Sequence, residues 1–256
     1  MINFKEFKNK TVLVTGSTKG IGLDIAKNFI YNGAKVAINS RNKIDIKNTI
    51  KKLGANNIYS ACGDVSNSKD SKKVFKSVMK SMGKLEILVC NVGSGESVKP
   101  GEENHLEWKK AFDKNFWSAI NIIESCKNEL IRNKGVIICI SSICGSELIP
   151  NAPTTYSVAK SALNTYVKSI SRPFGNLGLR INAVSPGNIL FKGSVWEKKI
   201  KKNKKEVIKL IDQNVSLKKI GIPQDISNLV LWLSSDKANF ITGTIITADG
   251  GQTRSF

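Results

Sequence analysis

The stretch Thr11-Val12-Leu13-Val14-Thr15-Gly16-Ser17-Thr18-Lys19-Gly20-Ile21-Gly22 decides the fold. Its first residues form a β-branched run typical of a buried strand, and a glycine turn follows at once and leads into an amphipathic segment. Glycine permits positive φ and a close approach of the backbone, while the free amides at the start of a helix favour negative charge. The stretch therefore predicts a strand, an anion-binding turn and a helix in direct succession.

Short β-branched runs alternate with longer amphipathic runs along the rest of the chain. The strands are predicted at Thr11 to Thr15, Lys35 to Asn39, Asn57 to Cys62, Leu85 to Cys90, Val136 to Ser141, Arg180 to Ser185 and Thr244 to Ala248. The helices are predicted at Ile21 to Asn32, Lys43 to Leu53, Ser68 to Met82, Glu107 to Asn133, Thr155 to Asn176, Trp196 to Asn214 and Pro223 to Ser235. This order predicts a single-domain, Rossmann-like α/β fold: a doubly wound parallel sheet of about seven strands with helices on both faces.

One connection is longer than the others. Residues 188–221 lie between two predicted strands and carry six closely spaced lysines: Lys198, Lys199, Lys201, Lys202, Lys204 and Lys205. A connection of this length predicts a helical insertion over the ligand end of the sheet. The lysines fit two interpretations, a solvated face or a substrate lid that attracts a phosphate, a carboxylate or an acidic carrier protein.

Composition narrows the class of protein. The chain has 256 residues, of which 41% are hydrophobic and 23% charged, so it is able to bury a core. The longest mostly apolar run, Gly135 to Cys144, is far shorter than the ~20 residues of a membrane-spanning helix. Met1 to Lys8 lack the apolar core of a secretory signal, so we expect a cytoplasmic protein without a membrane partner.

The formal net charge of +20 raises the question of an anionic partner. Few of the basic residues are arginines (Arg41, Arg132, Arg172, Arg180 and Arg254), and the lysines are scattered through a sequence rich in Asn and Ile, as an AT-rich coding background produces. A nucleic-acid surface would interleave arginines and aromatics along one face, and no such stripe is present in the sequence. We therefore expect no specific nucleic-acid partner.

Cysteine and histidine usage excludes two further classes of site. The five cysteines form no CxxC pair and are expected to be reduced, mostly in the core. The single histidine, His105, lies in a polar segment and is expected in a loop or at a helix start. A multi-histidine metal site and a Ser-His-Asp hydrolase are both unsupported, and we expect no metal.

The glycine turn stands after a strand and before a helix, which favours a dinucleotide site over a plain tight turn. Its expected cofactor-binding residues are Gly16, Ser17, Lys19, Gly20, Ile21 and Gly22. The end of the second strand, Asn39-Ser40-Arg41-Asn42, lacks the carboxylate that would accept hydrogen bonds from the ribose of NAD. Arg41, with Lys19, is able instead to hold a 2′-phosphate, which favours NADP (NADPH) over NAD. The alternative is that both are ordinary surface cations.

Tyr156 and Lys160 are spaced i, i+4 at the start of a predicted helix, on one face and a turn apart. A nearby ammonium lowers the pKa of a phenol from about 10 by about 1 to 3 units, which suits a group that exchanges a proton with an alcohol or carbonyl. Ser142 follows the fifth strand, where its hydroxyl projects from the carboxyl end of the sheet and is able to hydrogen-bond a reacting oxygen.

In this order the motifs resemble the short-chain dehydrogenase/reductase family over nearly the whole chain, most of all its members similar to 3-oxoacyl-(acyl-carrier-protein) reductases. The matching residues are Gly16, Gly20, Gly22, Asp64, Val65, Asn91, Gly93, Asn115, Ser142, Tyr156, Lys160, Pro186, Gly187 and the terminal Asp249-Gly250-Gly251. The resemblance implies that Tyr156 exchanges the proton, Ser142 steadies the substrate oxygen and Lys160 binds the nicotinamide ribose.

The resemblance also implies further roles. Asn115 would hold a water that connects the lysine to solvent, and Asp64 would contact adenine. Asn91 and Gly93 would line the adenosine side of the cofactor. The remaining expected cofactor-binding residues are Val65, Pro186, Gly187 and Ile189.

Three departures from the family pattern bear on substrate and affinity. Cys90 stands where the family usually has an asparagine, and Phe191 stands where it often has a threonine that bonds the nicotinamide carboxamide. Gly93-Ser94-Gly95-Glu96 and residues 188–196 give an unusual rim.

The sequence thus predicts an NADP(H)-dependent oxidoreductase, a carbonyl reductase that interconverts a ketone and a secondary alcohol by hydride transfer. A 3-oxoacyl thioester-like compound and a keto-sugar are both open as the small-molecule substrate, and a homotetramer or homodimer is expected. The alternative is a non-catalytic dinucleotide-binding sensor or scaffold. Such a protein is expected to lose Tyr156 or Lys160, and both are present.

Overall fold

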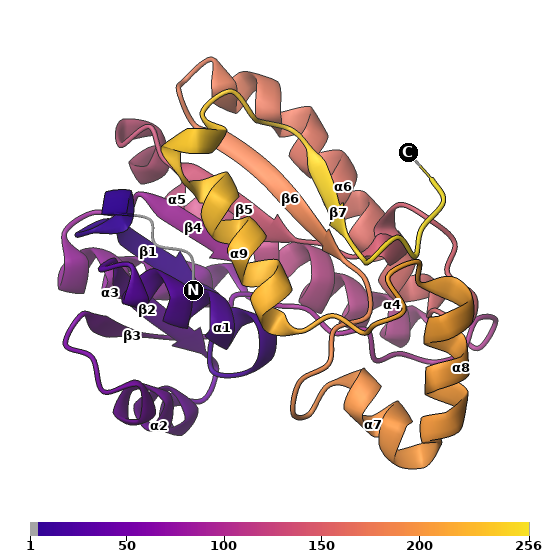
Figure 1. The fold of residues 1–256 in the computed structure, drawn as a ribbon. Helices are drawn as coiled ribbons and strands as arrows, with labels where there is room; N and C mark the ends of the chain where they lie inside the picture. The colour runs from indigo at the N-terminus through magenta and orange to yellow at the C-terminus, as the bar shows by residue number, and fades with distance from the viewer. Residues whose placement is uncertain (1–4, 256) are drawn as a thin grey trace.

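The computed structural model describes residues 5–255, and its centre is a seven-stranded parallel sheet in the order β3-β2-β1-β4-β5-β6-β7 (Figure 1). The strands are β1 (Thr11–Val14), β2 (Lys35–Ser40), β3 (Ile58–Cys62), β4 (Ile87–Cys90), β5 (Val136–Ile140), β6 (Arg180–Pro186) and β7 (Ile245–Ala248). All seven predicted strands are confirmed, with ends that differ by at most two residues. The order reverses between β1 and β4, and ligands of such sheets bind at the carboxyl ends of the strands beside that reversal.

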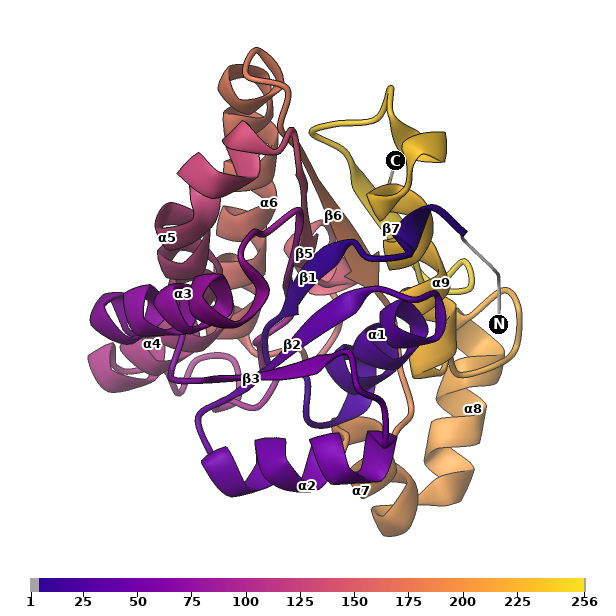
Figure 2. The same cartoon turned by 90° about the vertical axis from the view of Figure 1, so that its left-hand side faces the viewer.

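Helices cover both faces of the sheet. They are α1 (Gly20–Tyr31), α2 (Lys43–Leu53), α3 (Ser68–Met82), α4 (His105–Phe112), α5 (Ser118–Arg132), α6 (Thr154–Gly175), α7 (Val195–Lys202), α8 (Lys204–Asn214) and α9 (Pro223–Ser234). Figure 2 shows α1 and α9 on one side and α3, α5 and α6 on the other. The first four residues of the chain, part of the segment considered for a secretory signal, lie outside the described range.

Alternation along each strand builds two separate cores. In β1, Val12 and Val14 pack with α1, α2 and α9, whereas Leu13 packs with α3, α5 and α6. All residues of β1 and β5 are buried, because a parallel sheet between two helical layers leaves neither face to water. The two cores fix the register of the sheet and so the positions of the loops at its carboxyl edge.

Two predicted helices are interrupted. The segment predicted as one helix from Glu107 to Asn133 is α4, then a π-helical turn at Asp113–Trp117, then α5. The side chain of Asn115 donates to Ala111 O at 3.0 Å and so enters the backbone ladder, and the sequence gives no sign of it because the flanking residues keep helical dihedrals. The helix predicted from Trp196 to Asn214 ends at Asn203, whose side chain accepts from Glu206 N and caps α8 instead.

The expectations for single residue types mostly hold. All five cysteines are free, with Cys90, Cys126 and Cys139 buried and Cys62 and Cys144 half-buried. His105 is exposed at the first position of α4. Within residues 5–255, no helix has the length and apolarity needed to cross a membrane.

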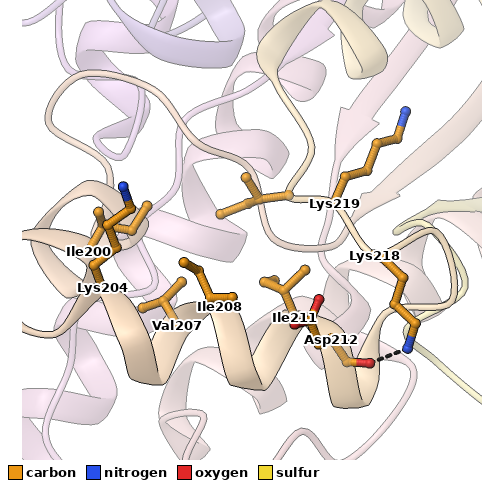
Figure 3. Close-up of a pocket in the computed structure, with 9 residues that line it drawn as sticks. Ile200, Lys204, Val207, Ile208, Ile211, Asp212, Lys218 and Lys219 are labelled. Atoms are coloured by element: carbon orange, nitrogen blue, oxygen red, sulfur yellow. Dashed lines mark hydrogen bonds between the residues drawn. The ribbon is translucent and has the colours of Figure 1, made fainter.

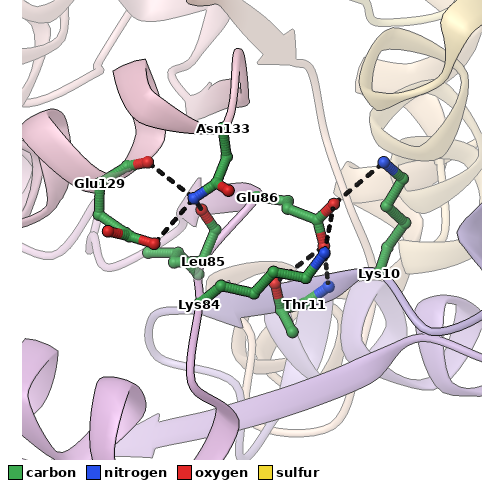
Figure 4. Close-up of polar contacts among 7 residues, drawn as sticks. All are labelled: Lys10, Thr11, Lys84, Leu85, Glu86, Glu129 and Asn133. Atoms are coloured by element: carbon green, nitrogen blue, oxygen red, sulfur yellow. Dashed lines mark hydrogen bonds and ion pairs between the residues drawn. The ribbon is translucent and has the colours of Figure 1, made fainter.

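A buried carboxylate joins the strands at the amino end of the sheet (Figure 4). Glu86, with a side chain only 11% exposed, accepts hydrogen bonds from Thr11 N and Thr11 Oγ1, both at 3.0 Å, and pairs with the ammonium groups of Lys10 and Lys84. Burial by itself would raise the pKa of this carboxyl, but the bonds from Thr11 and the two lysines outweigh it and leave the pKa below its ordinary value. The charged form therefore stabilises the fold.

Replacing Glu86 with glutamine is expected to lower the free energy of unfolding at pH 7 by about 1–3 kcal/mol, because the buried donors lose a charged acceptor. A carboxyl with a lowered folded pKa contributes stability above its unfolded value, about 4.5, and loses that contribution as the pH falls. Urea unfolding of both proteins from pH 7 to pH 3 should therefore show the difference shrinking in acid. A constant difference would contradict this account.

Candidate active site

The glycine turn is held in place by side chains from its two neighbouring strands. Gly16 N donates to Asn39 Oδ1 at 3.2 Å, and Asn91 Nδ2 donates to Thr15 O at 3.0 Å and Gly16 O at 3.1 Å. Asn39 is buried at the end of β2 and also donates to Ala61 O. The turn thus has a fixed shape, and Asn39 is a positioning residue that the sequence analysis missed. The signal available was an amide at the end of a buried strand.

Close contacts explain why the turn needs glycine. Gly16 and Gly20 have φ of +60° and +56°. A Cβ built on Gly22 would lie 2.3 Å from Asn91 Nδ2 and 2.5 Å from Gly16 O, and one built on Gly20 would lie 2.5 Å from the ring of Phe191. Gly16, Gly20 and Gly22 therefore leave the backbone at the start of α1 uncovered by side chains, and this arrangement admits a pyrophosphate.

The expected adenosine end lies beside the turn. Arg41 Nη1 is 3.6 Å from Asp64 Oδ2, so the two residues that the sequence analysis assigned to this end are neighbours. Asp64 also accepts from Ser66 N and Oγ, and Val65 is buried in the core. Lys19 lies toward α2, where it lines a hollow of about 280 Å³ with Thr18, Asp45, Asn48 and Thr49.

The three residues predicted to handle the proton lie at the carboxyl end of β5 and the start of α6. Lys160 is 2% exposed; its Nζ donates to Ile140 O at 2.8 Å and lies 6.0 Å from the centre of the Tyr156 ring. Ser142 is buried, and its Oγ accepts from Cys144 N at 3.2 Å. A hydrogen bond links Ser142 to Tyr156. The structure therefore brings the phenol, the amine and the hydroxyl into one cluster.

Burial dominates the ionisation of this cluster. It raises the pKa of Tyr156 to about 12, against the opposing hydrogen bond of Ser142, and lowers the pKa of Lys160 to about 8. The expectation that Lys160 lowers the pKa of the phenol is wrong for this structure, since the ammonium is turned to Ile140 O and desolvation is the larger effect. At neutral pH Tyr156 therefore keeps its proton.

The loop after β4 connects the turn to the cluster. It begins at Asn91, which bonds the glycine turn, and a Cβ built on Gly95 would lie 3.8 Å from the ring of Tyr156. Between them, a Cβ on Gly93 would lie 2.9 Å from Asn115 Oδ1 and 3.2 Å from Lys160 Nζ. The glycine turn, Asn115 and the tyrosine cluster therefore belong to one site.

Asn115 fastens this loop to the π-helical turn. It is buried, its Oδ1 accepts from Ser94 N at 2.9 Å, and its Nδ2 donates to Ser94 O at 3.1 Å. The side chain thus orients residues 93–95 beside Lys160. Its role in holding a water, which the family resemblance implies, stays a prediction.

The loop after β6 forms the opposite wall. Pro186 closes β6, Gly187 N donates to Ala248 O at 3.0 Å, and Ile189 pairs with Gly221 in an isolated bridge. Among the described residues, Ser185 Oγ and Asn188 Nδ2 are buried polar atoms without a hydrogen-bond partner. The hydroxyl of Tyr166 is in the same state, so the missing partners alone do not assign a ligand to this wall. The sequence analysis singled out neither Ser185 nor Asn188.

Helices α7 and α8 stand beyond this wall with a small core of their own, formed by Val207, Ile211 and Val215. Figure 3 shows aliphatic side chains of α8 facing the segment that carries Lys219, with Lys218 bonded to Asp212 O at one end. The groove between them has a volume of about 200 Å³. The predicted insertion is therefore helical, but in two pieces.

The residues present fit a dinucleotide. The glycine turn at the start of α1, without side chains at Gly16, Gly20 and Gly22, fits a pyrophosphate, and Arg41 and Asp64 lie together at the expected adenosine end. Within residues 5–255, no group of three His, Cys, Asp or Glu side chains is placed to hold a metal ion.

Known proteins share this arrangement. A family model described as Enoyl-(Acyl carrier protein) reductase matches residues 16–253. The chain is 34% identical to an uncharacterized oxidoreductase of Thermotoga maritima, over 96% of this chain and 98% of the relative. It is 29% identical to the 3-oxoacyl-(acyl-carrier-protein) reductase of Chlamydia trachomatis, over 95% and 97% of the two chains.

Solved structures agree with the sequence matches. L-sorbose reductase from Gluconobacter frateurii, complexed with NADPH and L-sorbose, has a TM-score of 0.89 at 25% identity, covering 97% of this chain and 98% of that one. A 7α-hydroxysteroid dehydrogenase complexed with NADH has a TM-score of 0.88 at 26% identity, covering 100% and 99%. Fold and matches together define an oxidoreductase that uses a pyridine nucleotide and acts on CH–OH groups. Within that class, the chain belongs to the short-chain dehydrogenase/reductase family.

Replacing Gly22 with alanine is expected to abolish tight dinucleotide binding and to cost about 1–3 kcal/mol of stability, because the new methyl group overlaps Asn91 Nδ2 and Gly16 O. Gly175→Ala is the matched control, since a Cβ added there would meet nothing within 4 Å and alanine favours a helix by roughly 0.5–1 kcal/mol. Calorimetric titration with NADPH and thermal unfolding measure both effects. Unchanged NADPH affinity in the Gly22 variant would contradict the assignment.

Proposed function

We propose that the protein is an NADPH-dependent carbonyl reductase that interconverts a ketone and a secondary alcohol. One observation carries the proposal: a single loop, from Asn91 to Gly95, bonds the glycine turn at one end and at the other passes so near Tyr156 that a Cβ added to Gly95 would lie 3.8 Å from its ring. A dinucleotide on that turn would extend toward the tyrosine cluster along this loop. The alternative of a non-catalytic sensor or scaffold has no need for a phenol, a hydroxyl and an amine gathered there.

The proton chemistry follows from the ionisation of the cluster. A bound reduced nicotinamide would supply the hydride that the carbonyl carbon accepts. Tyr156, whose pKa of about 12 keeps it protonated, donates its proton to the carbonyl oxygen as negative charge develops there, and Ser142 donates a hydrogen bond to the same oxygen. Lys160, held by Ile140 O, would orient the cofactor ribose.

The substrate remains a carbonyl compound of open identity, a 3-oxoacyl thioester-like compound or a keto-sugar. The relatives' names span an acyl-carrier-protein reductase, a sorbose reductase and a steroid dehydrogenase, so the shared fold accepts substrates of different chemistry. We infer that residues 188–221 act as the substrate lid.

We also propose that the chain forms a homotetramer or homodimer. Large apolar side chains are exposed at Leu106 in α4, at Trp117 in the π-helical turn and at Phe240 before β7. Such side chains lose contact with water when a second copy covers them. The cytoplasmic placement expected from the sequence stays a prediction.

The test of catalysis is Tyr156→Phe. Loss of the proton donor is expected to lower kcat by about 10²- to 10⁴-fold while NADPH binding is kept. Tyr166→Phe on the same helix is the control, because the Tyr166 hydroxyl is buried without a partner and its removal should leave activity unchanged. Turnover is followed by NADPH absorbance with a panel of ketones, acyl thioesters and keto-sugars. Turnover kept at the wild-type level in the Tyr156 variant would refute the role of Tyr156 as proton donor, and NADPH binding without any turnover in the wild type would favour the sensor hypothesis.

The preference for NADPH is tested at Arg41. Its guanidinium is 73% exposed at the end of β2, where it is free to hold a 2′-phosphate by charge-assisted hydrogen bonds. Arg41→Asp is expected to weaken NADPH binding roughly tenfold or more and to shift the preference toward NADH. Lys51→Asp, the same charge change at the far end of α2, is the control. An unchanged ratio of the two dissociation constants would refute the preference.

A further inference from the structure

Positive charge gathers on the side of the cluster that faces α7. Glu96 follows Gly95, where an added Cβ would lie 3.8 Å from the ring of Tyr156. Glu96 pairs with Lys198, which lies 102 residues further along the chain in α7. This ion pair spans from the rim of the site to the insertion. The pair therefore joins α7 to the loop that passes Tyr156, and we call the region around Glu96 and Lys198 the mouth of the site.

More than one cation acts on Glu96. The hydrogen bond and charge of Lys198 lower the pKa of Glu96 below its ordinary value, and the charges of Lys114 and Lys19 lower it further. These cations come from three separate elements: α7, the π-helical turn and the glycine turn. The convergence of elements distant in sequence distinguishes this mouth from a lysine run on one solvated helix.

Lys199 follows Lys198 in α7 and is a further cation that a ligand could use. Its Nζ lies 4.5 Å from the centre of the Trp196 ring, which holds the ammonium by a cation–π contact, and among the described residues no carboxylate pairs with it. Burial raises the pKa of the Cys144 thiol, and the charge of Lys199 acts on that thiol in the opposite direction. Since Cys144 N bonds Ser142 Oγ, the field of Lys199 reaches the turn that carries the catalytic hydroxyl.

We propose that the substrate is an anion, a ketone or secondary alcohol that carries a carboxylate or phosphate group, and that Lys199 binds this group. The inference rests on the proposed reductase function and narrows its substrate class. An ammonium beside a half-apolar wall attracts such a group by a charge-assisted hydrogen bond, and the surplus of cations around Glu96 raises the local concentration of anions. A neutral ketone would bring no negative charge to pair with the lysines at the mouth.

The experiment compares probes that differ only in charge. 4-Oxopentanoate and 5-oxohexanoate are paired with their methyl esters, and dihydroxyacetone phosphate is paired with dihydroxyacetone, so the carboxylate and phosphate arms are separate. Dissociation constants are measured by calorimetry with the Tyr156→Phe protein saturated with NADPH, in which turnover does not interfere. At low ionic strength, at least one anion is expected to bind roughly tenfold or more tightly than its neutral partner, and added salt should reduce that ratio.

Lys199→Gln is expected to remove most of this ratio, while Lys209→Gln, an exposed lysine of α8, should keep it. The affinity for NADPH should be the same in both variants. The proposal is overturned if neutral and charged partners bind equally, if no probe binds, if Lys199→Gln keeps the ratio, or if it weakens NADPH binding instead.

Failure of the reductase function has a different signature. In that case the wild-type protein would oxidise no NADPH with any of the probes, although the anions still bind through Lys199.

Discussion

The structure depends on the contact between the glycine turn and the loop after β4. Asn91, which follows β4, donates hydrogen bonds to the carbonyls of Thr15 and Gly16 after β1. A side chain at position 22 would overlap both Asn91 and Gly16 O, so only glycine fits there. This contact stands where the strand order reverses, so it fixes where helix α1 starts and where the loop toward Tyr156 leaves the sheet. A shift of the turn would therefore displace both ends of the site.

Burial has opposite consequences for the two ionisable groups of the site. A phenol taken from water holds its proton more tightly, and an ammonium releases its proton more easily. Burial thus keeps Tyr156 protonated, and it lowers the pKa of Lys160, which loses its proton more readily than an exposed lysine. Lys160 tolerates burial because Ile140 O accepts from it, and Asn115 keeps the loop beside it in place. The cluster is costly to bury, and the two hydrophobic cores beneath it supply the rigid support.

The lysines that give the chain its high net charge are scattered along the sequence, but they are not equivalent in the folded structure. Several lysines pair with a carboxylate one turn away on the same helix, as Lys73 does with Asp70 and Lys110 with Glu107. The pair of Lys198 with Glu96 is different, because it joins two segments that only the fold brings together. The lysines affect one place strongly only where separate elements bring several of them together, as around Glu96.

The sequence by itself determined the sheet, the glycine turn and the spacing of Tyr156 and Lys160, because strand alternation, glycine conformation and helical periodicity are local properties. It did not determine the π-helical turn at Asn115, the break at Asn203 or the role of Asn39. The break at Asn203 is a local cap made with Glu206 N, whereas Asn39 and Asn115 act through contacts with distant segments. The ionisation of Tyr156 was also decided by tertiary structure, since desolvation depends on what surrounds the phenol and not on the lysine one turn away.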